Sequence, residues 1–408
     1  MTTTIAIVGL SFSGLACYSS LLSKLPKQQK CVILLIDKKE YFEFTPSILS
    51  AFFSPKSHNA LSFPYSQTIG NSYIQGQLIK LTSNSLTIIK KDANEEEFLF
   101  DFCVLSFGGS YPFYIRPENE RTLDERRDAL LKAYSLIIEA KNIMIIGSGP
   151  TALEMAGYIK NKTKTPNVTV VVTGTELLKG FPKKAGKRVL DILVKKGVIF
   201  LFETEIKMEN GEIQDLGLKK KYDLIIPCVG NRCHATKMLN NDQTFKDFID
   251  TNRDRIIVNE FRQLQSKSQP TTVISNIFAC GDVAISYDNY RKNLNEPDVV
   301  MKAEKSAEVA AENITRILKN KKNDSKKEQL RKMGSTFDGY VVDLGSKWDC
   351  VFIWKGLVMV GLMAWLSKQM IEKCGMKKML GYRVFIWMFM VLHFVMNEVF
   401  TVCERRKY

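Results

Sequence analysis

The sequence predicts an α/β protein with two strand–turn–helix units of the kind that bind dinucleotides. Two stretches carry the pattern, IAIVGLSFSGLACYSSLL at 5–22 and NIMIIGSGPTALEMAG at 142–157. Each reads as an apolar strand, a glycine turn and a helix. Three further apolar runs, at 97–111, 221–232 and 276–284, carry glycine near their ends. One such motif is weak evidence, but two that each follow a β-rich run are strong.

The first turn departs from the G-x-G-x-x-G spacing at its centre. Gly9 and Gly14 hold the outer positions, and Ser11 stands where the middle glycine is usual. The middle residue lets backbone N–H groups approach a pyrophosphate at a helix N-terminus, where the dipole favours negative charge. A serine Cβ narrows that gap, but its hydroxyl can donate to a phosphate oxygen. We therefore expect the turn to tolerate the serine.

An acidic residue ends the next expected strand. The run CVILLIDKKEYF, at 31–42, places Asp37 at the strand end, where an acid can accept hydrogen bonds from an adenosine ribose. The alternative reading of the first motif is ordinary α/β packing without a nucleotide.

The second motif has Gly147, Gly149 and Ala152 in its three positions. Alanine is accepted in the last position because its role is close packing of helix on strand. In the segment NIFACGDVA, Asp282 follows Gly281 directly at a turn and precedes a helical run. These features predict a second nucleotide-binding turn and a further polar contact at a strand end.

The motifs resemble those of flavin oxidoreductases with two dinucleotide-binding folds, a group that includes the disulfide reductases. Residues 5–380 are most similar to type II NADH dehydrogenases and apoptosis-inducing-factor-like ferroptosis suppressor proteins. The resemblance implies that the first motif binds FAD, with Asp37 at its ribose and Asp282 at its ribitol. The helix near 302–306 would point its N-terminus at the flavin ring.

The resemblance also implies that the second motif binds NADH or NADPH, with Glu154 near the nicotinamide as the candidate catalytic residue. The alternative role for Glu154 is a polar residue on the outer face of its helix. No metal site is expected, since the three histidines are scattered. The residues expected to bind the cofactors are Gly9, Ser11, Ser13, Gly14, Asp37, Lys38, Gly108, Gly147, Gly149, Glu154, Gly230, Gly281 and Asp282.

Several positions depart from the family pattern. The family's A-T-G is replaced by Ser106-Phe107-Gly108, and the glutamine pattern beside the flavin is absent from KAEKSAEVA. Thr173 stands where an acid would favour NADH. The stretch DKKEYFEFTPSIL, at 37–49, looks like the one that replaces the disulfide motif in quinone reductases. We expect these changes to affect FAD binding less than they affect turnover.

The nine cysteines show no disulfide or zinc spacing, which fits a reducing compartment. Cys228 and Cys233 have the C-x4-C spacing of some disulfide reductases. They lie at a strand end far from the first motif, so we interpret them as buried bystanders. A disulfide is therefore not the expected electron acceptor.

The net charge of +15 suits nucleic acid or an anionic membrane surface. Basic residues are dense at 319–332 and recur around the apolar C-terminal run, which favours a membrane. No RNA-binding signature or helix-turn-helix pattern competes, so no nucleic acid partner is expected. The N-terminus shows neither a signal peptide nor a transit peptide, and Thr2 is not the glycine that myristoylation requires.

The C-terminal run predicts membrane attachment. Residues 356–380 mix apolar and basic side chains and can lie along a membrane surface. Residues 384–402 are apolar over about one hydrocarbon thickness. His393, Asn397 and Glu398 form a polar strip that either tolerates a short span or contacts a partner's membrane subunit. A buried core helix is the alternative.

We expect an FAD-binding domain at 1–112 and 255–330, an NAD(P)H-binding domain at 113–254 and a membrane-attachment region at 331–408. The expected function is a membrane-associated FAD-dependent NAD(P)H:quinone oxidoreductase, in which hydride passes from nicotinamide to flavin and then to a quinone. The alternative is a non-catalytic FAD-binding subunit of a larger, mitochondrial respiratory membrane complex, and the motif departures favour it. The mitochondrial inner membrane is the candidate location.

Overall fold

The computed structural model describes residues 2–380, apart from 27–28, 71, 118, 164–165, 207, 210–211, 214–220, 232, 240–242, 295–297, 321–327, 335–338 and 355. The chain divides into two compact units. The first comprises 1–42, 64–110 and 232–337, and the second comprises 43–63, 111–231 and 338–408. The predicted segment 384–402, with its polar strip, lies outside the described residues.

A nine-stranded sheet organises the first unit. Its centre is parallel, because β1 pairs with both β2 and β9, and β9 pairs with β19. The strands are nearly continuous apolar runs, as expected for a parallel sheet covered on both faces. In sheet order they are β16 (Ile249–Asp250), β17 (Arg255–Val258), β18 (Gln263–Gln265), β19 (Val273–Ala279), β9 (Phe102–Leu105), β1 (Thr3–Val8), β2 (Cys31–Asp37) and β5 (Tyr73–Gln75), with β20 (Ala284–Ser286) beside β17.

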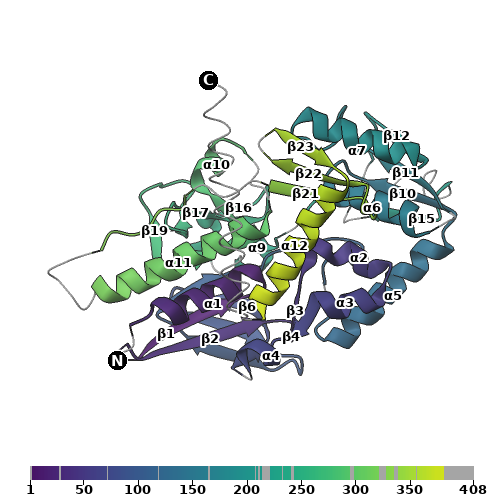
Figure 1. Ribbon diagram of the computed structural model, residues 1–408. Coiled ribbons are helices and arrows are strands. Elements are labelled where there is room, and N and C mark those ends of the chain that lie inside the picture. The colour runs from purple at the N-terminus through teal and green to yellow at the C-terminus, as the bar shows by residue number, and fades with distance from the viewer. Residues whose placement is uncertain are drawn as a thin grey trace. The chain divides into compact units, whose positions relative to one another are not determined.

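Two layers cover this sheet. The helices α1 (Phe12–Lys24) and α11 (Val300–Asn320) pack against each other on one face (Figure 1). The opposite face, onto which Ala6 and Val8 point, packs on the antiparallel strands β6 (Gln77–Leu81), β7 (Ser85–Ile89) and β8 (Glu95–Leu99) and on α9 (Ala235–Leu239). The remaining described elements of this unit are α4 (Ser66–Ile69), η2 (Gln243–Phe248), η3 (Gly281–Val283) and α10 (Tyr287–Arg291). The paired strands β3 (Tyr41–Glu43) and β4 (Ser62–Pro64) have residues in each unit.

The second unit has a parallel sheet in the order β12 (Val198–Leu201), β11 (Asn167–Val171), β10 (Asn142–Ile146) and β15 (Leu224–Pro227). The predicted α/β class with parallel sheets is therefore confirmed. The other elements before residue 338 are η1 (Thr45–Ser47), α2 (Ile48–Phe52), α3 (Pro55–Leu61), α5 (Leu123–Glu139), α6 (Pro150–Lys162), α7 (Lys183–Lys195), β13 (Met208–Glu209) and β14 (Glu212–Ile213).

A small C-terminal sheet completes the second unit. The antiparallel strands are β21 (Gly339–Asp343), β22 (Cys350–Trp354) and β23 (Leu357–Val360). They pack against α6, α7 and the last described helix, α12 (Leu362–Met379). Among the described residues, no helix has the length and apolar character needed to cross a membrane.

A buried ion pair joins three segments of the second unit. Arg126 is fully buried, and its guanidinium donates from Nε to Glu43 Oε2 at 2.7 Å and from Nη2 to Glu43 Oε1 at 3.1 Å. His58 Nε2 lies 3.0 Å from the same carboxylate, and Arg126 Nη1 donates to the Tyr114 carbonyl at 2.8 Å. Removing one partner of such a pair costs about 3–5 kcal/mol, because it strands a buried charge. The network therefore fixes α3 and α5 to the end of β3.

The helix α6 packs on the C-terminal sheet through a glycine. A Cβ added to Gly157 would lie 2.6 Å from Leu344 Cα and 2.7 Å from Leu344 O. Real Cβ atoms do not approach a backbone so closely, so only glycine allows this contact. Asn161 Nδ2 secures it by donating to the carbonyls of Leu344 and Gly157.

Substitution of Gly157 by alanine should lower the free energy of unfolding by about 1–3 kcal/mol, because the packed backbone must move. Gly174→Ala is the matched control, since a Cβ there meets no atom within 4 Å. Urea denaturation followed by circular dichroism measures both. Equal urea midpoints for the two variants would contradict the close contact between Gly157 and Leu344.

Candidate nucleotide-binding sites

The turn between β1 and α1 has no room for side chains at its two glycines. Gly9 has φ +96°, and a Cβ on it would lie 2.5 Å from both Ser106 O and Phe107 Cα. A Cβ on Gly14 would lie 1.8 Å from Gly9 O. The tight backbone crossing therefore explains both glycines.

Ser11, in contrast, has an ordinary backbone. It is the N-cap of α1 with φ −79° and ψ −151°, and its hydroxyl makes no capping bond. The serine is therefore compatible with the turn. The family departure at Ser106 is also accommodated, since its hydroxyl donates to the carbonyls of Gly9 at 2.8 Å and Val8 at 3.1 Å.

Asp37 lies at the same turn. Its carboxylate accepts from the Leu10 N–H at 2.6 Å and the Lys39 N–H at 2.8 Å, and it is 6% exposed. The Tyr65 hydroxyl lies 3.3 Å away, and burial together with Asp37 raises the pKa of that phenol well above its usual value. Lys38 contributes its carbonyl, which accepts from Gln75. The end of β2 is thus fixed to the glycine turn.

The Gly281–Asp282 turn is brought to the same end of α1. Gly281 has φ +71°, its N–H donates to Ser306 Oγ at 3.0 Å, and a Cβ on it would lie 2.8 Å from Ser13 Oγ. Asp282 follows in η3, and its carbonyl accepts from Cys233 Sγ at 3.0 Å. Ser13, Gly281 and Ser306 therefore connect α1 with α11.

This arrangement fits a dinucleotide. The first N–H groups of a helix have no partner within it, and no acidic residue lies in the first turn of α1. The parallel strands β1, β2, β9 and β19 all end at this edge, where Gly108, with φ +65°, follows β9. An anionic pyrophosphate at α1 would meet donors, and Asp37 stands where a ribose is expected.

The second glycine turn lies in the second unit. Gly147 has φ +137°, and a Cβ on it would lie 2.6 Å from Cys228 O. Gly149 is the N-cap of α6 and has open space where its Cβ would be, as does Gly230, with φ +109°. The turn therefore has room for a second pyrophosphate at the start of α6. Burial raises the pKa of the neighbouring Cys228 thiol to about 12, which keeps it protonated.

Glu154 belongs to a polar cluster that joins α6 to the C-terminal elements. Its Oε1 accepts from the Asp343 N–H at 2.9 Å. The Asp343 carboxylate in turn accepts from the Tyr158 hydroxyl at 2.7 Å and pairs with the Lys368 ammonium. Cys350 Sγ donates to it at 3.4 Å. The sequence pattern pointed to Glu154 alone, because nothing along the chain brings residues 343 and 368 near it.

The ionisable groups of this cluster shift one another's pKa values. Burial raises the pKa of Glu154 to about 7, against the opposing effects of Lys368 and the Asp343 N–H. Burial alone would raise the pKa of Asp343, but Lys368 holds it below its usual value. Glu154 is thus able to hold or release a proton near neutral pH. Its proximity to a nicotinamide stays a prediction.

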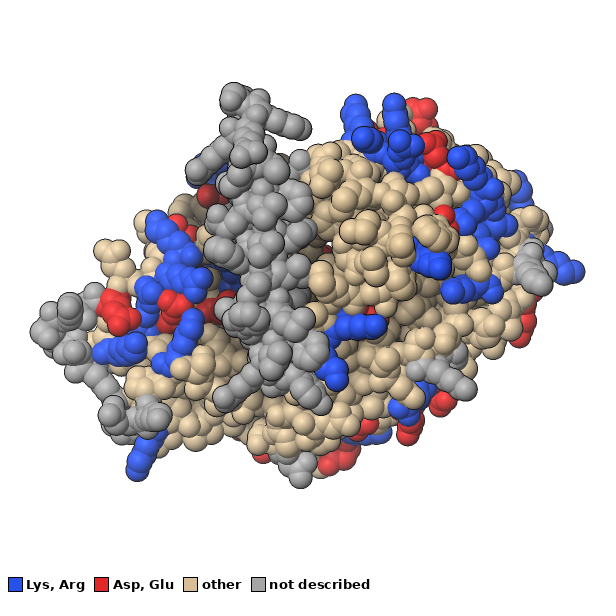
Figure 2. All heavy atoms as spheres, in the orientation of Figure 1, with Lys and Arg blue, Asp and Glu red and all other residues tan. Residues whose placement is uncertain are grey.

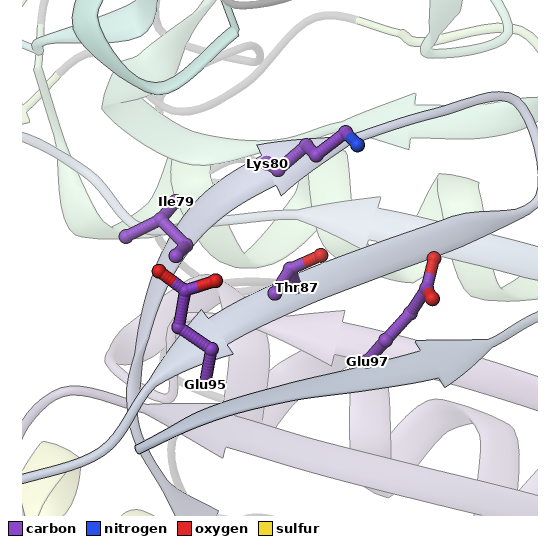
Figure 3. A pocket seen from close by; sticks show the side chains of 5 residues that line it. All are labelled: Ile79, Lys80, Thr87, Glu95 and Glu97. Atoms are coloured by element: carbon purple, nitrogen blue, oxygen red, sulfur yellow. The ribbon is translucent and has the colours of Figure 1, made fainter. Parts of the chain in front are cut away.

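A surface hollow of about 470 Å³ lies elsewhere in the first unit. It is lined by Ile79, Lys80, Thr87, Glu95 and Glu97, whose side chains stand on β6, β7 and β8 (Figure 3). None of these belongs to a glycine turn, and the two glutamates would repel a pyrophosphate. Among the described residues, no cluster of three or more His, Cys, Asp or Glu side chains could hold a metal ion.

A model of the pyridine nucleotide-disulphide oxidoreductase family matches residues 3–311, which include both glycine turns and the Gly281–Asp282 turn. The chain belongs to this family. The sequence-based assignment to two-dinucleotide-fold flavoproteins is confirmed, and so is the prediction of FAD and NAD(P)H as cofactors. Which residue contacts which cofactor, and the predicted domain limits, stay predictions.

The chain is also similar to known proteins over most of its length. Ferroptosis suppressor protein 1 of Xenopus tropicalis is 24% identical over 328 residues, covering 76% of this chain and 79% of that protein. Apoptosis-inducing factor homolog B of Dictyostelium discoideum is 22% identical over 349 residues, covering 78% and 82%.

Two solved structures share the fold. NDH2 from Plasmodium falciparum in complex with NADH has a TM-score of 0.68 at 14% identity and covers 90% of this chain and 94% of its own. The sulfide:quinone oxidoreductase of Aquifex aeolicus has a TM-score of 0.66 at 16% identity and covers 93% and 92%.

The Glu154 carboxyl predicts a pH-dependent stability. Its folded pKa of about 7 lies above the ordinary value of 4.5, so its contribution is complete below pH 4.5 and is lost as the pH rises through 7. Glu154→Gln does not titrate. The stability of the natural protein relative to this variant should therefore fall across that window, by up to about 1.4 kcal/mol per pH unit. Urea unfolding between pH 4.5 and 7.5 measures the difference, and parallel curves for the two proteins would contradict it.

Proposed function

We propose that this protein is a membrane-surface NAD(P)H:quinone oxidoreductase. The observation that carries the proposal is the pair of glycine turns, each with a helix N-terminus able to receive a pyrophosphate. FAD supplies the electron-transfer chemistry when bound. The chain contributes the positions of the two nucleotides, through Asp37 and Gly281–Asp282 in one unit and Gly147 and Gly149 in the other.

Quinone is the acceptor that fits the sequence around the flavin best. The stretch at 37–49, which corresponds to the disulfide motif of the disulfide reductases, contains no cysteine. In the structure it forms the end of β2, β3, η1 and the start of α2, with Phe42, Phe44 and Ile48 buried. A quinone acceptor is also supported by the shared fold with a sulfide:quinone oxidoreductase.

Glu154, in the second unit, can take part in proton movement. Its raised pKa lets it change charge near neutral pH, and Lys368 and Asp343 fix the surrounding charge. We infer that it orients the nicotinamide and accommodates the change in charge when hydride leaves. A catalytic role and the choice between NADH and NADPH are parts of the proposal.

The C-terminal elements support attachment to a membrane surface. Large apolar side chains are exposed on α12, on β23 and in the turn before β22, namely Trp348, Leu357, Val360, Leu362, Met363, Leu366, Met370 and Ile371. Lys347 lies over the Trp348 ring. The helix α7, which packs on the same small sheet, carries exposed basic residues that gather on the surface in Figure 2. Apolar and basic side chains together suit an anionic membrane. A mitochondrial location stays a prediction.

Substitutions at the two glycine turns should affect different cofactors. In the absence of oxygen, NADH or NADPH should bleach the bound flavin, and a ubiquinone analogue should restore its colour. Gly149→Trp should keep FAD and lose at least about tenfold in bleaching rate, because it closes the open space at α6. Ser11→Trp, the matched change at α1, should lose FAD instead. Absorbance at 450 nm measures both.

An unchanged bleaching rate in Gly149→Trp would place the nicotinamide elsewhere. A natural protein that holds FAD but neither bleaches nor regains colour would instead favour the non-catalytic subunit.

Binding of the protein to a membrane surface should depend on α12. In a chain ending after Leu380, Met363→Glu with Leu366→Glu should weaken binding to vesicles containing phosphatidylserine about tenfold, because two apolar contacts are replaced by charges of the same sign as the lipid. Leu99→Glu, at a residue 71% exposed on β8, is the control. Co-sedimentation measures the bound fraction, and equal loss in both variants would refute a specific role for α12.

A further inference from the structure

Arg262 is a buried positive charge without a counter-ion in the described part of the chain. Its side chain is 2% exposed. The guanidinium Nε meets no hydrogen-bond acceptor, and no carboxylate of the described residues forms an ion pair with it. Burying an unpaired charge opposes folding, so such residues usually acquire a partner.

The backbone at Arg262 is also unusual. It lies in the turn between β17 and β18 with φ +72°, a left-handed conformation that favours glycine or asparagine. Its N–H donates to the Asn259 carbonyl at 3.0 Å, and its own carbonyl accepts from the Ala279 N–H at 3.0 Å. The turn is thus held firmly against β19. The arginine occupies a position where neither its backbone nor its burial is favourable.

The side chain lines a cavity of about 10 Å³ at the Gly281–Asp282 turn, and Arg255, Lys302 and Ser306 line it as well. The neighbouring cation differs from Arg262 in having a partner, because Arg255 Nη2 lies 2.8 Å from Asp298 Oδ1. Ser306 is also satisfied, since it accepts from the Gly281 N–H and donates to the Ala303 carbonyl. The carboxylates of Asp282 and Asp298 line the same cavity, so its three cations exceed its anions by one. Arg262 is the cation of Arg255 and Arg262 that forms no ion pair with a described carboxylate.

The positive charge of Arg262 affects the pKa of the Cys280 thiol. Burial raises the pKa of the Cys280 thiol to about 12, and the positive charge of Arg262 opposes that shift. Cys280 directly precedes Gly281, the residue whose N–H bonds to α11. A group that acquires negative charge at the Gly281–Asp282 turn would be stabilised in the same way.

We propose that Arg262 offsets the negative charge that the flavin gains on reduction. The inference rests on the proposed function, in which hydride passes from NAD(P)H to FAD. Hydride carries two electrons and one proton, so the nicotinamide is oxidised and becomes cationic while the flavin is reduced and gains one negative charge. A nearby unpaired cation favours the reduced flavin over the oxidised one. Arg262 thereby raises the reduction potential without donating or accepting a proton.

The test compares flavin potentials in the full-length, FAD-loaded protein. Arg262→Asn removes the charge and suits the left-handed backbone, so the variant should fold. Its FAD should favour the oxidised form about tenfold more than in the natural protein, which lowers a two-electron potential by about 30 mV. Equilibrium titration with dithionite and a reference dye measures the shift without NAD(P)H or quinone. A failure of the proposed function would appear only in the NAD(P)H and quinone experiments above.

Three further measurements distinguish this role from a structural one. Arg262→Lys should retain most of the natural potential, and Arg291→Gln, which removes one exposed positive charge, should not shift it. The melting temperature of FAD-free Arg262→Asn should equal or exceed that of the natural protein, since an unpaired buried charge and a strained residue are both removed. A potential unchanged in Arg262→Asn, or a lower melting temperature for its FAD-free form, would overturn the proposal.

Discussion

The close crossing of three backbone segments at the end of β1 is the constraint on which the first unit depends. Gly9, Gly14 and the segment at 106–107 approach within distances that leave no volume for a Cβ at either glycine. This crossing aligns the start of α1 with the ends of β1, β2 and β9, so the helix dipole, Asp37 and Gly108 share one edge of the sheet. The position between the two glycines is free of that constraint, and this is why a serine can occupy it.

Buried charge plays a corresponding part in the second unit. One network joins Arg126, Glu43 and His58, and another joins Glu154, Asp343 and Lys368. Burying charged groups costs free energy, and this cost is offset only when every partner is in place. Each network therefore specifies the arrangement of segments that are distant in sequence. The second also leaves Glu154 with a proton affinity suited to neutral pH.

The sequence predicted most of what local pattern determines. The two glycine turns, the strand ending in Asp37 and the Gly281–Asp282 turn could all be placed, because each depends on residues only a few positions apart. The partners of Glu154 could not be placed, since Asp343 and Lys368 come from a sheet and a helix about two hundred residues later. Arg262 was missed for a related reason: a lone arginine in a polar turn gives no sign of burial. The small C-terminal sheet could not be predicted either, because its three short strands lie beside an apolar and basic run whose composition indicates a membrane surface.

The face of α6 turned toward the C-terminal sheet has a consequence for how this protein can evolve. Glu154, Gly157, Tyr158 and Asn161 recur at the spacing of one helical face, and each is engaged by residues 343 or 344. The same helix begins at the second glycine turn. A lineage could not exchange its C-terminal region for another, as modular proteins exchange domains, without remaking the helix that begins at this turn. The C-terminal sheet and α6 are thus constrained to change together, as one unit of selection.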